Sequence, residues 1–417
     1  MEEIQNLLLL ALQAGLNQTT VEWQQPMETK KWAELFRLAA AHKVLPMVYE
    51  AVYACPAAKQ ADPRLFAAYK QQTMLSVMQQ ARKTGEFLEL YEYLGKSGVT
   101  PLVVKGIVCR SLYPKPDHRP SGDEDLLIPE VQFARCHQAM LDYGMELVDP
   151  GIDLKSAYEV PYRKPDSPLY IELHKRLFPP ESEAYGDLNR FFPENVRKTR
   201  TLTVDGKQLV TLDDTEHMLY LICHALKHFL HSGFGIRQVS DIALFANAYG
   251  KELDWQRLLD CCKEIHGEIF AAALFRIGEK YLTLSPEQAE IPEAWRSILA
   301  DEQPLLGDLL DSGIYGDATM SRKHSSTMTL DAVAAEKHGK RAAGLRKTLF
   351  PAAKQLEGRY PYLKKKPYLL PIAWLQRIGQ YGSETRKQND GSNRAADAVK
   401  IGAKRVELLR TYGILRK

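Results

Sequence analysis

Apolar residues recur at helical spacing at both ends of the chain and at shorter spacing in the middle. Residues 1–98 show the helical pattern, most clearly over 32–45, where Pro46 interrupts it. Residues 99–212 hold short apolar runs separated by turns, and helical spacing returns after them. These patterns predict an α+β fold, in which a small mixed-sheet domain is embedded between an N-terminal helical region and a C-terminal helical bundle.

The middle segment is expected to alternate strands with helices. A hairpin is predicted where Asp205-Gly206 separates two runs of alternating polarity. The expected strands are 101–105, 123–128, about 157–163, 169–174 and the two arms of the hairpin 201–210, and the expected helices are 107–112 and 130–143.

The second half of the chain is expected to be helical. Asp213, three residues before Glu216, is typical of a capping-box start for a helix that runs through Leu230. Further helices are expected from Asp254 and over 262–282, then a loop or disordered linker over 381–394 and a basic amphipathic helix over 395–412. The chain therefore divides into residues 1–98, 99–212, 213–380 and 381–417.

The charge distribution is uneven although the net charge is only +3. From Lys340 to the end there are 19 Lys or Arg residues against 5 Asp or Glu residues, so the rest of the chain is acidic. A basic tail indicates an anionic partner, nucleic acid included, or simply a solvated basic surface, and composition does not choose between them.

Cysteine usage and the N-terminus favour a cytoplasmic protein without membrane insertion. The six cysteines show no CxxC pair, which is typical of reduced thiols. The apolar run from Leu7 to Leu12 is far shorter than a membrane span and is expected to face the core.

Three acidic residues are the strongest candidates for chemistry. Asp123 and Asp125 are two apart in an expected strand, so their carboxylates project from the same face. Glu172 lies among apolar residues in a later strand, where an acidic side chain is disfavoured unless it is paired or exposed. Three carboxylates on one sheet face could hold Mg²⁺, or Mn²⁺, beside substrate phosphates.

Several basic residues and histidines accompany these carboxylates. Arg119 is placed to touch a phosphate, or else to pair with Asp117 in its loop. His174 shares a strand face with Glu172 and could orient it, contact a nucleotide or simply pack in the core. Arg237 and Asp241, one helical turn apart, form either a structural ion pair or part of a site.

A further helical face carries histidines at positions 217, 224, 228 and 231. The HxxxH spacing of His224 and His228 is also found in zinc sites, so a zinc hydrolase is one possible function.

Longer motifs join these candidates into a recognisable string. The chain contains Val104-Lys-Gly, Leu112-Tyr-Pro, Arg119-Pro-Ser-Gly-Asp-Glu-Asp-Leu-Leu-Ile, Ile171-Glu-Leu-His and Leu221-Ile-Cys-His-Ala-Leu-Lys-His. This string resembles the DNA polymerase-β-type nucleotidyltransferase superfamily and, within it, a bacterial family of uncharacterised nucleotidyltransferases. The resemblance extends from the N-terminal helices to about residue 380.

The resemblance implies roles for individual residues. Asp123, Asp125 and Glu172 would be the catalytic metal ligands, with Glu172 or a metal-bound hydroxide as the base. Gly106 would let the backbone approach a triphosphate, and Lys227 and His228 would offer it basic groups. Two positions depart from the superfamily pattern: Ile107 replaces a small residue, so that Lys105 would supply the phosphate contact, and Glu124 replaces an apolar residue and would face the opposite side of the sheet.

The implied activity is transfer of a nucleoside monophosphate from a nucleoside triphosphate, ATP being the first candidate, to a hydroxyl acceptor with release of pyrophosphate. The acceptor is not identified and could be anionic. The alternative is a catalytically degenerate protein on the same fold that binds a nucleotide or a partner, which Ile107 and Glu124 motivate.

Overall fold

The computed structural model describes residues 2–194, 198–312, 320–338, 360–364, 366–376 and 394–416. The chain forms two compact units, the first made of residues 1–229 and 233–317 and the second of residues 230–232 and 318–417. The division of the sequence at residues 98, 212 and 380 stays a prediction. The expected linker over 381–394 lies outside the described residues except for its last position.

The N-terminal region is helical, as predicted. Its helices are α1 (Glu3–Leu16), α2 (Thr29–Ala41), α3 (Leu45–Val52) and the long α4 (Pro63–Lys96). The helical pattern over 32–45 is divided before Pro46, because α2 ends at Ala41 and Pro46 lies in the first turn of α3, where a missing N–H costs nothing. Asp62 caps α4 by accepting a hydrogen bond of 2.9 Å from the Arg64 backbone N–H.

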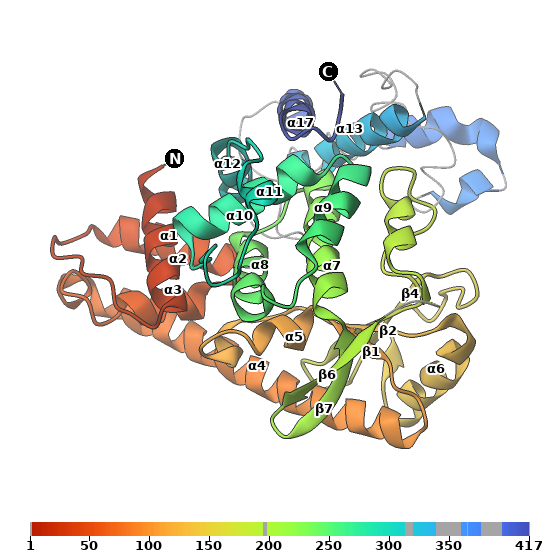
Figure 1. Cartoon of the computed structure of the whole chain (residues 1–417), viewed down its shortest axis with the longest axis horizontal. Coiled ribbons are helices and arrows are strands. Elements are labelled where there is room, and N and C mark those ends of the chain that lie inside the picture. The colour runs from red at the N-terminus through yellow and green to blue at the C-terminus, as the bar shows by residue number, and fades with distance from the viewer. Residues whose placement is uncertain are drawn as a thin grey trace. The chain divides into compact units, whose positions relative to one another are not determined.

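A seven-stranded mixed sheet forms the centre of the first unit (Figure 1). Its order is β3-β4-β5-β2-β1-β7-β6. The strands are β1 (Leu102–Val104), β2 (Glu124–Leu127), β3 (Glu146–Leu147), β4 (Glu159–Arg163), β5 (Tyr170–His174), β6 (Thr199–Val204) and β7 (Lys207–Leu212). The predicted strands and the hairpin are confirmed, with positive φ at Asp205 and Gly206, whereas the two-residue β3 was not predicted.

The two faces of the central strands differ in polarity. On one face β4 and β5 place Val160, Tyr162, Ile171 and Leu173, all fully buried. Helix α6 (Phe133–Asp142) lies on this face, where its His137 Nδ1 atom is 2.6 Å from the Tyr162 hydroxyl, and α5 (Gly106–Arg110) contacts β1 and β2. The opposite face carries the alternating polar positions of the same strands, so strand alternation alone separates the core from a polar surface.

The remaining helices of the first unit are α7 (Asp214–Leu230), α8 (Ile236–Tyr249), α9 (Trp255–Glu264), α10 (Glu268–Tyr281), α11 (Glu293–Arg296) and α12 (Gln303–Ser312). The predicted start of α7 is confirmed, because the Glu216 N–H donates to Asp213 at 2.7 Å. The second unit contains α13 (Met320–Lys337) and α17 (Arg394–Thr411), and α17 corresponds to the predicted basic helix.

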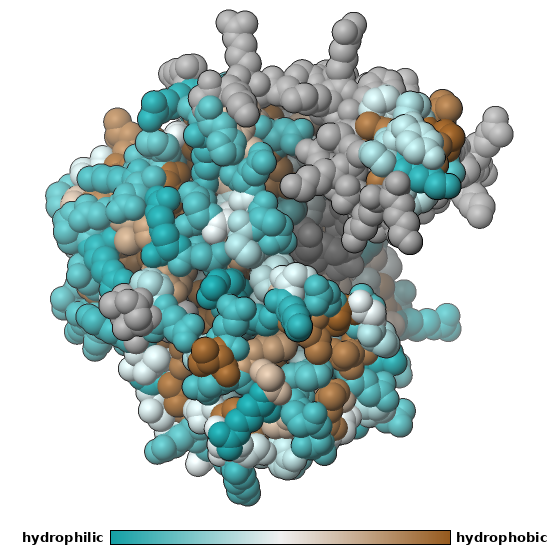
Figure 2. Space-filling model, turned by 90° about the vertical axis from the view of Figure 1, so that its right-hand side faces the viewer, coloured by the Kyte–Doolittle hydropathy of each residue, from teal (hydrophilic) through white to brown (hydrophobic). Residues whose placement is uncertain are grey.

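The surface shown in Figure 2 is largely hydrophilic, with hydrophobic residues interspersed among polar ones. None of the described helices is both long enough and apolar enough to span a membrane.

A buried carboxylate joins the sheet to α5. Glu124 points to the apolar face, as its position predicts, and is fully buried. It pairs with Arg110 at 2.9 Å and accepts hydrogen bonds from the Ile107 N–H at 2.8 Å and the Ser121 hydroxyl at 3.0 Å. A Cβ atom on Gly106 would lie 2.0 Å from the Glu124 carboxylate, so a larger residue would displace Glu124 from its present position. Glu124 therefore acts as the N-terminal cap of α5 from a neighbouring strand.

The Glu124→Ala substitution should lower the free energy of unfolding by about 3–5 kcal/mol, because it leaves Arg110 buried without its carboxylate. Chemical denaturation measures this value. The control is Glu146→Ala, which removes an exposed carboxylate paired with Arg163 and should change stability by less than about 0.5 kcal/mol. Equal effects of the two substitutions would contradict this role for Glu124.

Candidate functional site

Two carboxylates meet on the polar face of the sheet. Strand β2 pairs in parallel with β5, and this register sets Asp125 directly beside Glu172. Directly paired residues of neighbouring strands point to the same face, so the two side chains extend together. Asp125 is buried and Glu172 is partly buried. The spatial convergence of acidic residues from two strands, expected from the sequence, is confirmed for this pair.

His174 completes the group. One ligand atom each from Asp125, Glu172 and His174 lies within 4.8 Å of the other two, close enough to surround one cation. The His174 Nε2 atom is 3.4 Å from Asp125 and 3.8 Å from Glu172, while its Nδ1 atom is 3.6 Å from Glu159. Glu159 of β4 lies opposite His174 in the antiparallel pairing, which places it on the same face.

Asp123 lies beside this group and not within it. It precedes β2 and is partly exposed. Its charge contributes to the raised pKa values of both Glu172 and Lys105, so it acts on the same region. Among the described residues, the compact donor set is thus two carboxylates and an imidazole, with Asp123 at its edge.

The crowding of negative charge has a measurable consequence. Burial, together with the charges of Asp125 and Asp123, raises the pKa of Glu172 to about 8. Burial alone would also raise the pKa of Asp125, but Lys105 and His174 outweigh it and hold that pKa below its ordinary value. A divalent cation would relieve the repulsion at Glu172, and carboxylate oxygens suit Mg²⁺ or Mn²⁺. The residues present therefore fit a divalent cation.

Lys105 is the positive group of the site. It occupies the turn between β1 and α5 with a φ of 56° and a ψ of −109°, a region that non-glycine residues rarely adopt. Its ammonium donates to Asp125 at 3.1 Å and lies 3.2 Å from the His224 Nε2 atom. Its backbone N–H donates to the His217 Nε2 atom at 3.0 Å. The fold thus imposes an unusual turn and brings the Lys105 ammonium to the carboxylates.

The histidines of α7 serve this turn. Burial lowers the pKa of His217 to about 3, so the ring is neutral and accepts the Lys105 N–H. His224 contacts the Lys105 ammonium, and its Nε2 atom is 3.1 Å from that of His228. Within the described residues, no group of three metal-ligating side chains includes His224 and His228. The HxxxH spacing therefore provides no zinc site of that kind in this part of the chain. Lys227 and His228 are both partly exposed.

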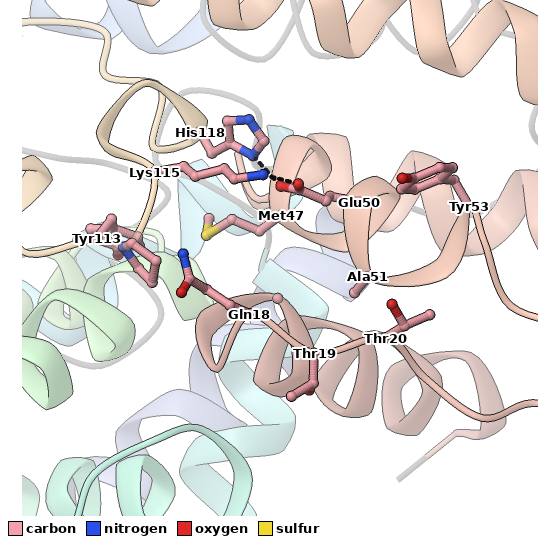
Figure 3. A pocket seen from close by; sticks show the side chains of 12 residues that line it. Gln18, Thr19, Thr20, Met47, Glu50, Ala51, Tyr53, Tyr113, Lys115 and His118 are labelled. Carbon is pink, nitrogen blue, oxygen red and sulfur yellow. Dashed lines mark hydrogen bonds and ion pairs between the residues drawn. The ribbon is translucent and has the colours of Figure 1, made fainter.

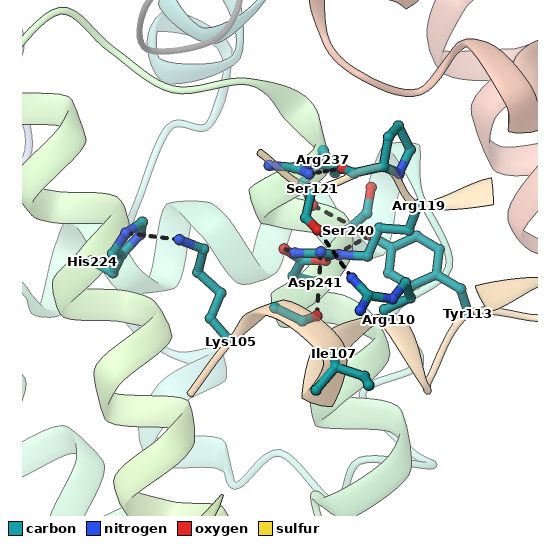
Figure 4. Close-up of polar contacts among 12 residues, drawn as sticks. Lys105, Ile107, Arg110, Tyr113, Arg119, Ser121, His224, Arg237, Ser240 and Asp241 are labelled. Atoms are coloured by element: carbon teal, nitrogen blue, oxygen red, sulfur yellow. Dashed lines mark hydrogen bonds and ion pairs between the residues drawn. The ribbon is translucent and has the colours of Figure 1, made fainter. Parts of the chain in front are cut away.

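Two predicted phosphate contacts have other partners in the structure. Arg119 is fully buried, and its Nε and Nη2 atoms donate to Asp241 at 2.7 and 2.6 Å (Figure 4). Its Nη1 atom donates to the Gly106 carbonyl at 3.3 Å. An internal ion pair thus replaces both the predicted phosphate contact and the alternative pairing with Asp117. At Gly106, where a triphosphate was expected to approach the backbone, the Glu124 carboxylate lies close by and accepts the Ile107 N–H.

Cavities lie elsewhere in the first unit. A cavity of about 200 Å³ lies among α1, α3 and the loop 113–118, where Glu50 pairs with Lys115 and His118 (Figure 3). A second cavity of about 270 Å³ lies beside α4 and the loop at Pro120 and Ser121. Neither is lined by a residue predicted to be catalytic.

Sequence reasoning missed one residue of the site and the partners of two others. Glu159 could have been found, since it alternates with the buried Val160 and Tyr162 positions of its strand. His217 was grouped with the other histidines of its helix, but nothing in the sequence indicated that it binds the turn at Lys105. The helical spacing of Asp241 pointed to Arg237, whereas its partner is Arg119, 122 residues away in sequence.

One comparison with known proteins identifies a family for this chain. A family model described as "Uncharacterised nucleotidyltransferase" matches residues 28–283, more than half of the chain. The matched span includes Asp123, Asp125, Glu172 and His174. No curated protein matches the chain. A crystal structure of an antigenic nucleotidyltransferase-like protein from Paracoccidioides brasiliensis is similar at 12% identity, covering 50% of this chain and 96% of that chain with a TM-score of 0.32. A TM-score of this size supports neither a shared site nor a shared activity.

The pKa of Glu172 predicts a pH-dependent effect of Glu172→Gln in metal-free protein. An acid whose pKa rises from 4.5 to about 8 on folding contributes stability that is present at low pH and is lost as the pH rises through 8. Glutamine does not ionise, so Glu172→Gln should raise the melting temperature relative to wild type more at pH 9 than at pH 5.

Thermal unfolding in the presence of a chelator measures this difference. The control is Glu287→Gln, which changes an exposed carboxylate and should shift the melting temperature equally at both pH values. If Glu172→Gln also shifts it equally at pH 5 and pH 9, Glu172 is not crowded by neighbouring charge.

Proposed function

Because this chain belongs to the family of uncharacterised nucleotidyltransferases, we propose that it transfers a nucleoside monophosphate from a nucleoside triphosphate to a hydroxyl acceptor. ATP is the first candidate donor, and the mechanism is of the DNA polymerase-β type. In this reaction the acceptor oxygen bonds to the α-phosphorus, the bond from that phosphorus to the bridging oxygen breaks, and pyrophosphate leaves.

One observation carries the proposal: the parallel register that sets Asp125 beside Glu172. The two carboxylates, with Asp123 at the edge and His174 behind, would hold the divalent cations, Mg²⁺ or Mn²⁺. When bound, such cations neutralise the phosphates and orient the acceptor and the leaving group for in-line displacement.

The protein's own groups have separate tasks in this reaction. The Glu172 carboxylate accepts the proton of the acceptor hydroxyl as its oxygen bonds to phosphorus. His174 holds Asp125 in place through its Nε2 atom, and Glu159 faces the other ring nitrogen. Lys105, already at Asp125, presents its ammonium to the phosphates of the donor. Lys227 and His228 on α7 are proposed to contact the same phosphates.

The proposed acceptor is defined by its chemistry: it is a compound with a nucleophilic hydroxyl. The basic tail favours an anionic acceptor, with nucleic acid as one example, and the protein is proposed to act in the cytoplasm. Fold does not determine the acceptor in proteins of this kind.

The alternative of a degenerate nucleotide- or partner-binding protein rested on Ile107 and Glu124. Both have structural tasks here: Glu124 caps α5, and the Ile107 N–H is the group it caps. Glu124 points to the opposite face of the sheet from Asp125, and Ile107 lies on α5. These two differences from the superfamily pattern therefore do not disturb the pairing of Asp125 with Glu172.

The test is pyrophosphate release from ATP with Mg²⁺ or Mn²⁺, using cell extract as the source of acceptors. Asp125→Asn and Glu172→Gln should each lower the rate by about 100-fold or more, because each removes a cation ligand. Glu130→Gln, an exposed carboxylate paired with Arg176, is the matched control and should keep the wild-type rate.

Two results would contradict the proposal. One is wild-type protein that releases no pyrophosphate above the double variant Asp125→Asn/Glu172→Gln with any extract or nucleotide. The other is full activity of either single variant. Nucleotide binding without turnover would support the non-enzymatic alternative instead.

A further inference from the structure

Two arginines lie next to one aspartate, and only one of them pairs with it. Arg119 forms both of its carboxylate hydrogen bonds with Asp241. Arg237, one helical turn before Asp241 on α8, has no ion pair with any described carboxylate. Its Nη1 atom donates to the Pro120 carbonyl, and its Nε atom is buried without a hydrogen-bond partner. A partly buried guanidinium with an unused donor is an unfavourable arrangement unless water or a ligand completes it.

Arg237 contacts the loop that leads to Asp123. Pro120, which it contacts, begins the loop that leads through Ser121 and Gly122 to Asp123. Its charge acts on Lys105, and the charge of Asp123 acts on it in turn. In Figure 4, Arg237 and Lys105 extend from α8 and from the turn before α5 toward the same region, with His224 beside Lys105.

Lys105 and Arg119 are paired with Asp125 and Asp241, whereas Arg237 has no ion pair with a carboxylate of the described residues. Burial and the neighbouring Arg119 lower the pKa of the Arg237 guanidinium below its ordinary value. Since an arginine stays charged in proteins, an anion beside it would remove an electrostatic cost that the fold otherwise bears.

We propose that Arg237, together with Lys105, forms the subsite that binds the β- and γ-phosphates of the donor nucleotide. The inference rests on the proposed function, because it assigns the leaving pyrophosphate to the side of the site formed by α8 and the turn before α5. A guanidinium can form two parallel hydrogen bonds to phosphate oxygens, and the Lys105 ammonium adds a point charge. Arg119 and the N-terminus of α5 are already bound to Asp241 and Glu124, so neither competes for this role.

Binding of phosphate compounds to the full chain tests the subsite without requiring turnover. Isothermal titration with sodium tripolyphosphate, ATP and AMP, each with Mg²⁺, compares wild type with Arg237→Gln. The substitution should weaken tripolyphosphate and ATP binding about tenfold or more, because charge-assisted hydrogen bonds are lost. AMP lacks the β- and γ-phosphates, so its affinity should change much less.

Two further variants separate binding from structure. Arg237→Lys keeps the charge and should restore part of the ATP affinity, whereas a purely structural clamp on Pro120 would lose ATP and AMP affinity together. Arg163→Gln is the matched control, because it removes an exposed arginine paired with Glu146 and should leave all three affinities unchanged.

The outcomes distinguish this inference from the proposed function. Tripolyphosphate binding that depends on Arg237, in a protein without pyrophosphate release, would keep the subsite and contradict the transferase. Pyrophosphate release with wild-type ATP affinity in Arg237→Gln would keep the transferase and overturn the subsite. Equal loss of ATP and AMP affinity, or wild-type protein that does not bind tripolyphosphate, would also overturn it.

Discussion

The parallel pairing of β2 with β5 is the constraint on which the site depends. It sets Asp125 beside Glu172 and, two residues further along β5, places His174 on the same face. Like charges held this close are unfavourable by themselves, as the raised pKa of Glu172 shows. The Lys105 ammonium offsets part of that cost, and we propose that a divalent cation offsets the rest. Lys105 and Asp123 add their charges beside these two carboxylates.

The alternation of strand residues lets one short strand serve both the core and the site. In β2, Glu124 points toward α5 and Asp125 points the other way. Glu124 is neutralised by Arg110 and fixes the start of α5, and the residue just before that helix is Lys105. Glu124 and Asp125 therefore contact the same turn from opposite faces of the sheet. Glu124 accepts the Ile107 N–H, and Asp125 accepts a hydrogen bond from the Lys105 ammonium. Glu124, between the two aspartates, therefore has a structural role: it pairs with Arg110 and caps α5.

Local sequence patterns predicted most of the secondary structure, because strand alternation, Pro46, Asp205-Gly206 and the Asp213 cap act over a few residues. The same alternation predicted that Glu172 shares a face with His174. Contacts between distant segments were not predictable in this way. Arg119 was assigned to a phosphate because its partner Asp241 is 122 residues away, and short-range spacing favoured Arg237 for that aspartate. The close approach of Glu124 to Gly106 was likewise not predicted, because Glu124 comes from the next strand.

The central claim is that Asp125 and Glu172 bind one divalent cation together. The most direct test is a double-mutant cycle on Mn²⁺ affinity with wild type, Asp125→Asn, Glu172→Gln and the double variant. The electron paramagnetic resonance signal of free Mn²⁺ measures each affinity. If the two carboxylates share a cation, the double variant should bind Mn²⁺ little more weakly than either single variant. Losses that simply add, or Mn²⁺ affinity that neither substitution changes, would contradict the account.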